Sequence, residues 1–245
     1  MRHFVRPLTL AILTLCAAPA AAQVAVDAGV EAASDEARRG LSWSGGRATA
    51  SADVVATRGA LEASARLVTT RGAARHGGAD AVGDLTLAGG WNVGAIRLRA
   101  QAAAHLFAGA QGRMDYVELG GSASYGYGPL YLTGGAMLAP SQAAIGGSNL
   151  YVFARASAGI PGTPLTLIGD IGHSSGTTGD PARAQRLRPG GDYADWRLGL
   201  EHRRDGLTLG VDYVGTDVAR ADAFGPYADA RHAGDRIVGR VRFDF

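Results

Sequence analysis

Apolar and polar residues alternate strictly along many segments of this chain, each about ten residues long. In residues 207–213, LTLGVDY, the apolar side chains take every odd position and Thr, Gly and Asp the even ones. A period of two places the two sets on opposite faces of a β-strand. Glycine supplies 37 of the 245 residues, which disfavours helices. The chain is therefore expected to be all-β, with strands that have one apolar and one charged face.

The segments are separated by connections that are alternately short and long. Tight-turn signals occur at 58–59, 92–94, 128–129, 161–163 and 205–206. Longer polar stretches occupy 34–45, 69–81, 108–115, 140–148, 174–191 and 216–234. The pattern predicts 12 strands, at 24–33, 46–56, 60–68, 82–91, 95–107, 116–127, 130–139, 149–160, 164–173, 192–203, 206–215 and 236–245.

An even number of strands with short turns on one side and long loops on the other is typical of transmembrane antiparallel β-barrels. Closure matters there because lipid cannot satisfy the backbone groups of an open sheet edge. The alternative is a secreted β-sandwich or jelly roll. We favour the barrel because the apolar face is mostly Ala, Val, Leu and Gly, which suits lipid better than a dense core. One barrel domain is expected over residues 23–245, with short periplasmic turns and longer outer loops.

The first 22 residues have the pattern of an export signal. Basic residues precede an apolar run at 8–18, and Ala20-Ala21-Ala22 forms the cleavage site before Gln23. Cys16, the only cysteine, lies in this segment, so no disulfide framework is expected. Removing Arg2 and Arg6 from 24 basic residues leaves 22, equal to the 22 acidic ones. This balance of charge argues against a nucleic-acid partner. After residue 22, no apolar run reaches the roughly 18–20 residues of a transmembrane helix.

Charged residues on the polar face of the strands are expected to line the lumen, because an Arg facing lipid at mid-depth costs about 2–4 kcal/mol. They could bias which solutes pass, or they could pair across strands and brace the wall. Near balance of charge predicts weak ion selectivity. The predicted pore-lining residues are Arg97, Arg99, Arg155, Arg197, Arg240, Arg242, Asp53, Asp84, Glu118, Asp170, Asp195, Glu201 and Asp212.

Catalytic and metal-binding signals are sparse. His173 and Ser175 form the one weak catalytic candidate, a His-x-Ser pair in which His would act as general base; we expect no enzyme. His76, His202 and His232 stand singly, so we predict solvated or headgroup-level side chains, no metal site and no cofactor. The aromatics near strand ends, Trp43, Trp91, Tyr125, Tyr127 and Tyr131, are expected to form interfacial girdles.

The chain ends inside an alternating strand, RIVGRVRFDF. If this strand pairs with the first one, the barrel closes and no edge is exposed. Ile237, Gly239, Val241, Phe243 and Phe245 would then face lipid. The terminal aromatics Phe243 and Phe245 are expected to serve as the signal that barrel-assembly machinery recognises.

Three stretches resemble the TorF-type porin family of Gram-negative bacteria. EAASDEARRGLSWS matches its opening signature through Ser34, Asp35, Arg39, Gly40, Ser42 and Ser44. The central hairpin is similar through Tyr116, Glu118, Leu119, Gly120 and Gly128-Pro129, and the late hairpin through Asp192, Tyr193, Trp196, Gly206, Leu207, Asp212 and Asp217. The resemblance implies an outer-membrane barrel and a channel, without catalytic residues.

The sequence thus leads to a principal functional hypothesis and two alternatives. The first is an outer-membrane porin-like channel for passive diffusion of small solutes, in contact with outer-membrane lipid and inserted by the assembly machinery. The second is a barrel closed by its own charge pairs, whose outer loops make surface contacts. The third, less favoured, is a lipid hydrolase that uses His173 and Ser175. Nothing in the sequence specifies the oligomeric state.

Overall fold

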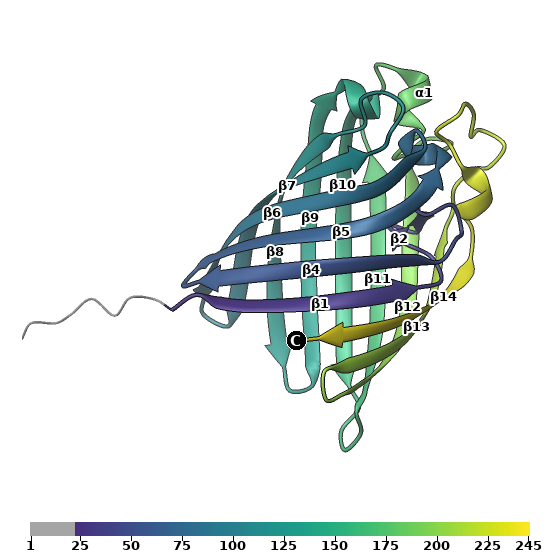
Figure 1. Cartoon of the computed structure of the whole chain (residues 1–245). Helices are drawn as coiled ribbons and strands as arrows, with labels where there is room; N and C mark the ends of the chain where they lie inside the picture. Colours follow the sequence, from purple (N-terminus) through teal and green to yellow (C-terminus); the bar gives the residue numbers. More distant parts are fainter. Residues whose placement is uncertain (1–22) are drawn as a thin grey trace, which may run out of the picture.

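The computed structural model describes residues 23–245, so the predicted export signal at 1–22 lies outside the described residues. The chain forms one closed antiparallel barrel of 12 strands (Figure 1), which confirms the predicted fold class. The barrel strands are β1 (Ala25–Ala33), β4 (Thr49–Arg58), β5 (Leu61–Ala73), β6 (Ala79–Val93), β7 (Ile96–Ala108), β8 (Tyr116–Tyr127), β9 (Leu130–Gln142), β10 (Gly147–Gly159), β11 (Leu165–Ser175), β12 (Tyr193–Arg204), β13 (Leu207–Thr216) and β14 (Arg236–Asp244).

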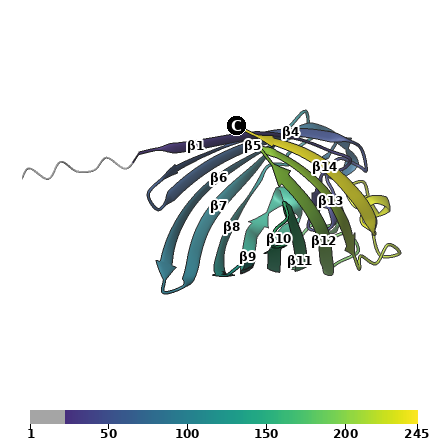
Figure 2. The same ribbon diagram turned by 90° about the horizontal axis from the view of Figure 1, so that it is seen from below.

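The first and last strands close the barrel. β1 pairs with β14 on one side and with β4 on the other, and the C-terminus lies beside β1 in Figures 1 and 2. The backbone N–H of Phe245 donates to the carbonyl of Ala28 at 2.9 Å. Gly29 of β1 lacks the side chain that would collide with Arg242, so this arginine crosses β1 and binds Asp53 of β4 at 2.5 and 3.1 Å. The predicted seam is therefore present and carries its own ion pair.

The outward face of the barrel is apolar. Leu61, Leu87 and Ile237 are 66–71% exposed, and many smaller apolar side chains share this face. Tyr127 and Trp91 are exposed near the short-turn end, as the girdle prediction expects, but Trp43 is buried inside the barrel and belongs to no girdle. No helix within residues 23–245 is long and apolar enough to cross a membrane.

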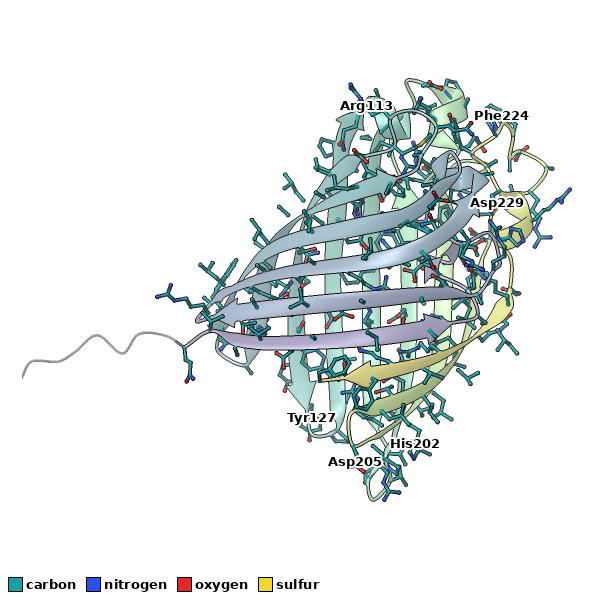
Figure 3. All side chains as sticks on the ribbon, viewed as in Figure 1. Arg113, Tyr127, His202, Asp205, Phe224 and Asp229 are labelled. Carbon is teal, nitrogen blue, oxygen red and sulfur yellow. The ribbon has the colours of Figure 1, made fainter. Side chains whose placement is uncertain are left out.

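The connections alternate between tight turns and longer loops. Figure 3 labels Tyr127, His202 and Asp205 at the short-turn end and Arg113, Phe224 and Asp229 at the loop end. The predictions of long loops at 69–81 and 140–148 were wrong, because β5 continues to Ala73 through an irregularity in its pairing with β6, and β9 continues to Gln142 before β10 begins at Gly147. Four short elements lie in the loops: η1 (Ala74–His76), η2 (Ala143–Ile145), α1 (Pro181–Ala184) and η3 (Ala230–His232).

A second, two-stranded sheet formed by β2 (Ala37–Arg38) and β3 (Leu41–Ser42) lies inside the barrel. In Figure 1, β2 is seen behind the wall that β4 and β5 form. We call residues 34–46 the plug hairpin. The prediction of an outer loop at 34–45 was wrong, because the charged side chains of this segment pair with charges on the lumen wall rather than with external water.

Candidate functional site

The lumen is closed at the loop end and accessible to water at the short-turn end. On β12 the inward residues Tyr193 and Asp195 are 2% and 5% exposed, whereas Arg203 near the turn is exposed. On β8, Tyr116 and Glu118 are buried and the inward residues nearer the turn are only partly covered. A 12-stranded barrel is wider than its own wall side chains can fill. Additional chain must therefore occupy the closed half.

The plug hairpin supplies part of that chain. Its two strands pair as Arg38 with Leu41, leaving Arg39 and Gly40 as a two-residue turn with φ of 50° and 70°, the left-handed geometry of a tight hairpin turn. A Cβ on Gly40 would lie 2.6 Å from the carbonyl oxygen of Gly215 and 2.9 Å from Cβ of Asp195. Only glycine satisfies both the turn and this close approach to the wall.

Two arginines fasten the tip of the plug hairpin to the wall. The Arg38 guanidinium binds both carboxylate oxygens of Asp84 at 3.1 and 2.7 Å. Arg39 binds Glu118 at 2.7 Å and lies over the Tyr151 ring, 4.4 Å from its centroid. Because these pairs are partly desolvated, removal of one partner leaves an uncompensated charge and costs more than the loss of an exposed salt bridge.

The remaining acids of the hairpin are also paired. Glu36 accepts from Arg38 at 2.8 Å and from Arg66 of β5 at 2.7 Å. Burial by itself raises the pKa of this carboxyl, but Arg38 and Arg66 outweigh burial and hold it below its usual value. His105 of β7 lies between Asp84 and Glu118, at 2.7 and 3.3 Å. The hairpin and wall thus form one continuous network of charges.

Asp35 organises the base of the hairpin. One carboxylate oxygen accepts from the hydroxyls of Ser42 and Ser44 at 2.5 and 2.7 Å, and the other from Arg236 of β14 at 2.6 Å. The Tyr193 hydroxyl donates to the carbonyl of Arg39 at 3.0 Å. The residues that carry the resemblance in the opening signature therefore build and position the plug hairpin.

The other outer connections pack over the hairpin as a cap, defined by residues 74–78, 109–115, 143–146, 176–192 and 217–235. An apolar core shared by the cap, the plug hairpin and the wall contains Trp43, Phe107, Met114, Ile145 and Leu187, all buried. The expectation that His76 is solvated was wrong. It is fully buried, with its ring 4.4 Å from that of Trp43 and 4.8 Å from that of Phe107, because the cap encloses it. Burial and the neighbouring Arg186 and Arg75 hold its pKa well below the usual value.

Two fully buried arginines tie all six outer connections together. Arg75 donates to the carbonyls of Ser42, Arg186 and Asp229 at 3.3, 2.8 and 3.1 Å. Arg186 donates to the carbonyls of Met114 and Ala144. Burial lowers the pKa of each guanidinium to about 10. The cap is consequently a single hydrogen-bonded unit.

Below the hairpin lies a cavity of about 580 Å³, which we call the chamber. Its lining includes the hairpin residues Arg38, Arg39 and Gly40 and wall residues from most strands. Among the predicted pore-lining residues, those in the chamber are Asp84, Glu118, Arg155, Asp170, Asp195, Arg197, Asp212 and Arg240.

Most of these wall charges are paired across neighbouring strands. Asp170 is shared by Arg155 at 2.9 Å and Arg197 at 3.5 Å. Asp212 is shared by Arg197 and Arg240, both at 2.9 Å, and Arg240 also contacts Glu201. The result is an alternating row of charges along β10–β14, the arrangement expected if the charges brace the wall.

The other predicted site residues lie away from the chamber. Arg99 binds Glu62 at 2.7 Å, and Arg97 is exposed beside it on β7. Arg242 and Asp53 form the seam pair described above. Phe243 and Phe245 are 44% and 74% exposed on the outer face, with their rings in edge contact at 5.2 Å. Whether they act in assembly stays a prediction.

The catalytic candidates face away from the lumen. His173 is exposed on β11, and Ser175 is half-buried on the same outward face. Neither side chain makes a hydrogen bond to any described residue, so no acid orients His173 within residues 23–245. The inward side chain between them belongs to Ser174, which is buried.

Sequence reasoning singled out Asp35 and Arg39 in the opening signature but did not predict that they form a plug with Glu36 and Arg38. One local signal was available, because Arg39-Gly40 lies between short flanks as in a two-residue hairpin turn. Arg75 and Arg186 had no such signal, since their partners are carbonyl groups of loops distant in the chain.

The architecture is that of a closed 12-stranded barrel resembling outer-membrane porins, with a charged chamber and a filled loop end. Residues 17–238 match the family model described as "Bacterial protein of unknown function (Gcw_chp)". The chain therefore belongs to the Gcw_chp family. The narrower resemblance to TorF-type porins stays a prediction.

Solved structures of outer-membrane proteins share the fold. A KdgM porin matches with a TM-score of 0.58 at 6% identity, over 89% of this chain and 99% of that one. An outer membrane channel from Pseudomonas putida F1 matches with 0.52 at 11% identity, over 90% and 95%. LpxR from Salmonella typhimurium matches with 0.50 at 10% identity, over 89% and 99%. At these identities the likeness shows the fold alone. A search of curated proteins found no match.

Proposed function

We propose that this protein is a channel of the cell outer membrane for passive diffusion of small polar solutes, closed in the present conformation by the plug hairpin. One observation carries the proposal: a charged chamber, accessible from the short-turn end, stops at a hairpin that ion pairs hold in place. The short-turn end faces the periplasm in barrels of this kind. Solutes would therefore meet the chamber first from the periplasmic side.

The plug hairpin is the part whose displacement would open the lumen. Its strands have two residues each, and its tip contacts the wall mainly through Arg38 and Arg39. Water and dissolved ions can replace such ion pairs, whereas the 12 barrel strands are bound by continuous backbone ladders. Opening also requires the cap to loosen at Ser42, where Arg75 holds the base of the hairpin.

The charges of the chamber predict weak selectivity. The wall contributes six carboxylates, Glu31, Asp84, Glu118, Asp170, Asp195 and Asp212, and four arginines, Arg66, Arg155, Arg197 and Arg240. The plug hairpin adds two acidic and two basic residues. The chamber therefore has an excess of two negative charges whether or not the hairpin is present. We expect a mild preference for cations rather than a specialised filter.

Planar-bilayer recording of the refolded protein tests this proposal. The double variant Arg38→Gln, Arg39→Gln removes both ion pairs at the tip, and Arg113→Gln removes an exposed loop arginine as the control. We expect brief, nearly ohmic steps from the unchanged protein, with openings at least tenfold more frequent in the double variant only. Silence of all three, with a heat-modifiable gel shift verifying the barrel, contradicts the channel. Equal conductance in all three contradicts the role of the hairpin.

A second function is favoured by the cap. Arg75 and Arg186 bind all six outer connections into one unit, which suits a permanently closed barrel whose loops at 176–192 and 217–235 make surface contacts. This alternative predicts that replacing those loops changes surface phenotypes without changing permeability. Neither proposal contains a catalytic step. In both, the partners are outer-membrane lipid and the barrel-assembly machinery.

A further inference from the structure

We propose that the chamber binds a small organic cation with a guanidinium head, and that Asp195 is its anionic anchor. The inference deepens the proposed function and rests on it for the route by which a solute reaches the chamber. Binding itself can be measured without any conductance.

Asp195 is an unpaired carboxylate in a network where its neighbours are paired. Among the described residues, every other carboxylate of the chamber lies within 4 Å of an arginine nitrogen. Asp195 is 5% exposed; its Oδ1 accepts from the Tyr151 hydroxyl at 3.2 Å, and its Oδ2 has no partner. A buried carboxylate without a cation is costly. A bound cation would offset that cost.

The surroundings of Asp195 already hold one guanidinium. Arg39 of the plug hairpin binds Glu118 and lies over the Tyr151 ring at 4.4 Å. A carboxylate acceptor and an aromatic face beneath the cation are two features by which proteins recognise guanidinium groups. The hairpin therefore acts as an internal occupant of a site that suits an external ligand of the same chemistry.

Ligand binding at Asp195 is coupled to the position of the hairpin. Gly40 packs directly against the Asp195 side chain, where an added Cβ would be 2.9 Å away. Gly40 and Asp195 both line the chamber, so a cation that binds Asp195 from the chamber competes with this turn for space. The ligand would then favour the open state, because it binds more tightly where the hairpin has moved.

The chemistry of the chamber favours an organic cation over a metal ion. No group of three or more His, Cys, Asp or Glu side chains in residues 23–245 is placed to hold a metal. The excess of two negative charges on the chamber wall attracts cations of any kind, and the Tyr151 ring adds affinity for flat, weakly hydrated ones.

Calorimetric titration of the refolded full barrel with methylguanidinium tests the inference, with neutral methylurea as the matched probe. We expect methylguanidinium alone to bind, and Asp195→Asn to weaken it at least tenfold. The control is Asp27→Asn, which removes an exposed charge near the short-turn end, on the face of β1 that also carries Glu31. This variant should change the affinity less than twofold. Tyr151→Leu keeps the Asp195 carboxylate but removes the ring and the hydroxyl that donates to Oδ1, and it should weaken binding at least threefold.

Equal affinity in Asp195→Asn and the unchanged protein overturns the site, as does equal heat from methylurea. If Asp195→Asn does not fold, unchanged binding by Tyr151→Leu overturns it instead. A barrel that binds methylguanidinium but stays silent in bilayers rejects the channel and leaves the cation site standing. A barrel that conducts but does not bind methylguanidinium rejects the cation site and leaves the channel standing.

Discussion

Replacing Gly40 by Ala should release the plug hairpin. The residue has φ of 70°, where a Cβ costs about 1–2 kcal/mol. The new methyl group would also meet Thr216, the Gly215 carbonyl at 2.6 Å and Asp195 at 2.9 Å. The Gly215 oxygen belongs to the backbone and the Asp195 atom is Cβ. Neither atom can move away from the new methyl group by a side-chain rotation. Such overpacking typically costs about 1–3 kcal/mol.

The two costs together amount to roughly 2–5 kcal/mol in the closed state. Both costs disappear when the hairpin leaves the wall and its turn relaxes, so their sum shifts the closed–open equilibrium. Since every 1.4 kcal/mol is tenfold, opening should increase at least about 30-fold. Gly94→Ala is the matched control, because Gly94 has φ of 60° in a tight turn and nothing within 4 Å of its Cβ position.

Limited trypsin digestion with mass spectrometry measures the release directly. The chain has no lysine, so all tryptic sites are arginines, and cleavage after Arg39 requires the turn to leave the lumen. We expect this cut to be faster in Gly40→Ala than in Gly94→Ala, with more frequent openings in bilayers. Equal rates of cleavage in the two variants would refute the argument that Gly40 seats the hairpin.

Three further predictions concern the cap and the seam. Arg186→Met should speed hydrogen exchange in the 109–115 and 143–146 loops, since each buried carbonyl left without a donor costs about 1–3 kcal/mol; the exposed Arg113→Met should not. The pKa of His76 is lowered in the folded cap, so only the unfolded chain takes up a proton just below the unfolded pKa of about 6.5. The free energy of unfolding should therefore be unaffected by His76 above this pH and fall by up to about 1.4 kcal/mol per pH unit below it. Thermal unfolding between pH 8 and 5 should show this slope, and His76→Phe should flatten it. Deleting Phe245 should reduce insertion into membranes, measured by the heat-modifiable gel shift, before it alters the conductance of inserted molecules.

The barrel could be predicted from the sequence because its determinants are local. Alternation assigns each strand, and residues such as Gly128-Pro129 and Asp205-Gly206 mark the turns where the structure has them. The seam followed from the alternation that continues to Phe245. Each of these signals is contained within about ten residues, so no knowledge of distant contacts was needed.

The plug could not be predicted in the same way. A polar segment that faces external water and one that faces a charged lumen have the same composition, so Glu36, Arg38 and Arg39 gave no indication of their location. The burial of Trp43 and His76 depends on loops distant in the chain. The sequence indicated that the wall charges could pair across strands, but it did not indicate which residues pair. Arg242, for example, reaches Asp53 only because Gly29 lies between them.

The hydrogen bonds of Arg75 and Arg186 have a consequence for how the outer surface can change. Their acceptors are main-chain carbonyls at positions 42, 114, 144, 186 and 229, and every amino acid supplies the same carbonyl. Substitutions in these loops therefore preserve the fastening as long as the backbone follows the same path. The cap can therefore diversify its side chains while its backbone hydrogen bonds are kept.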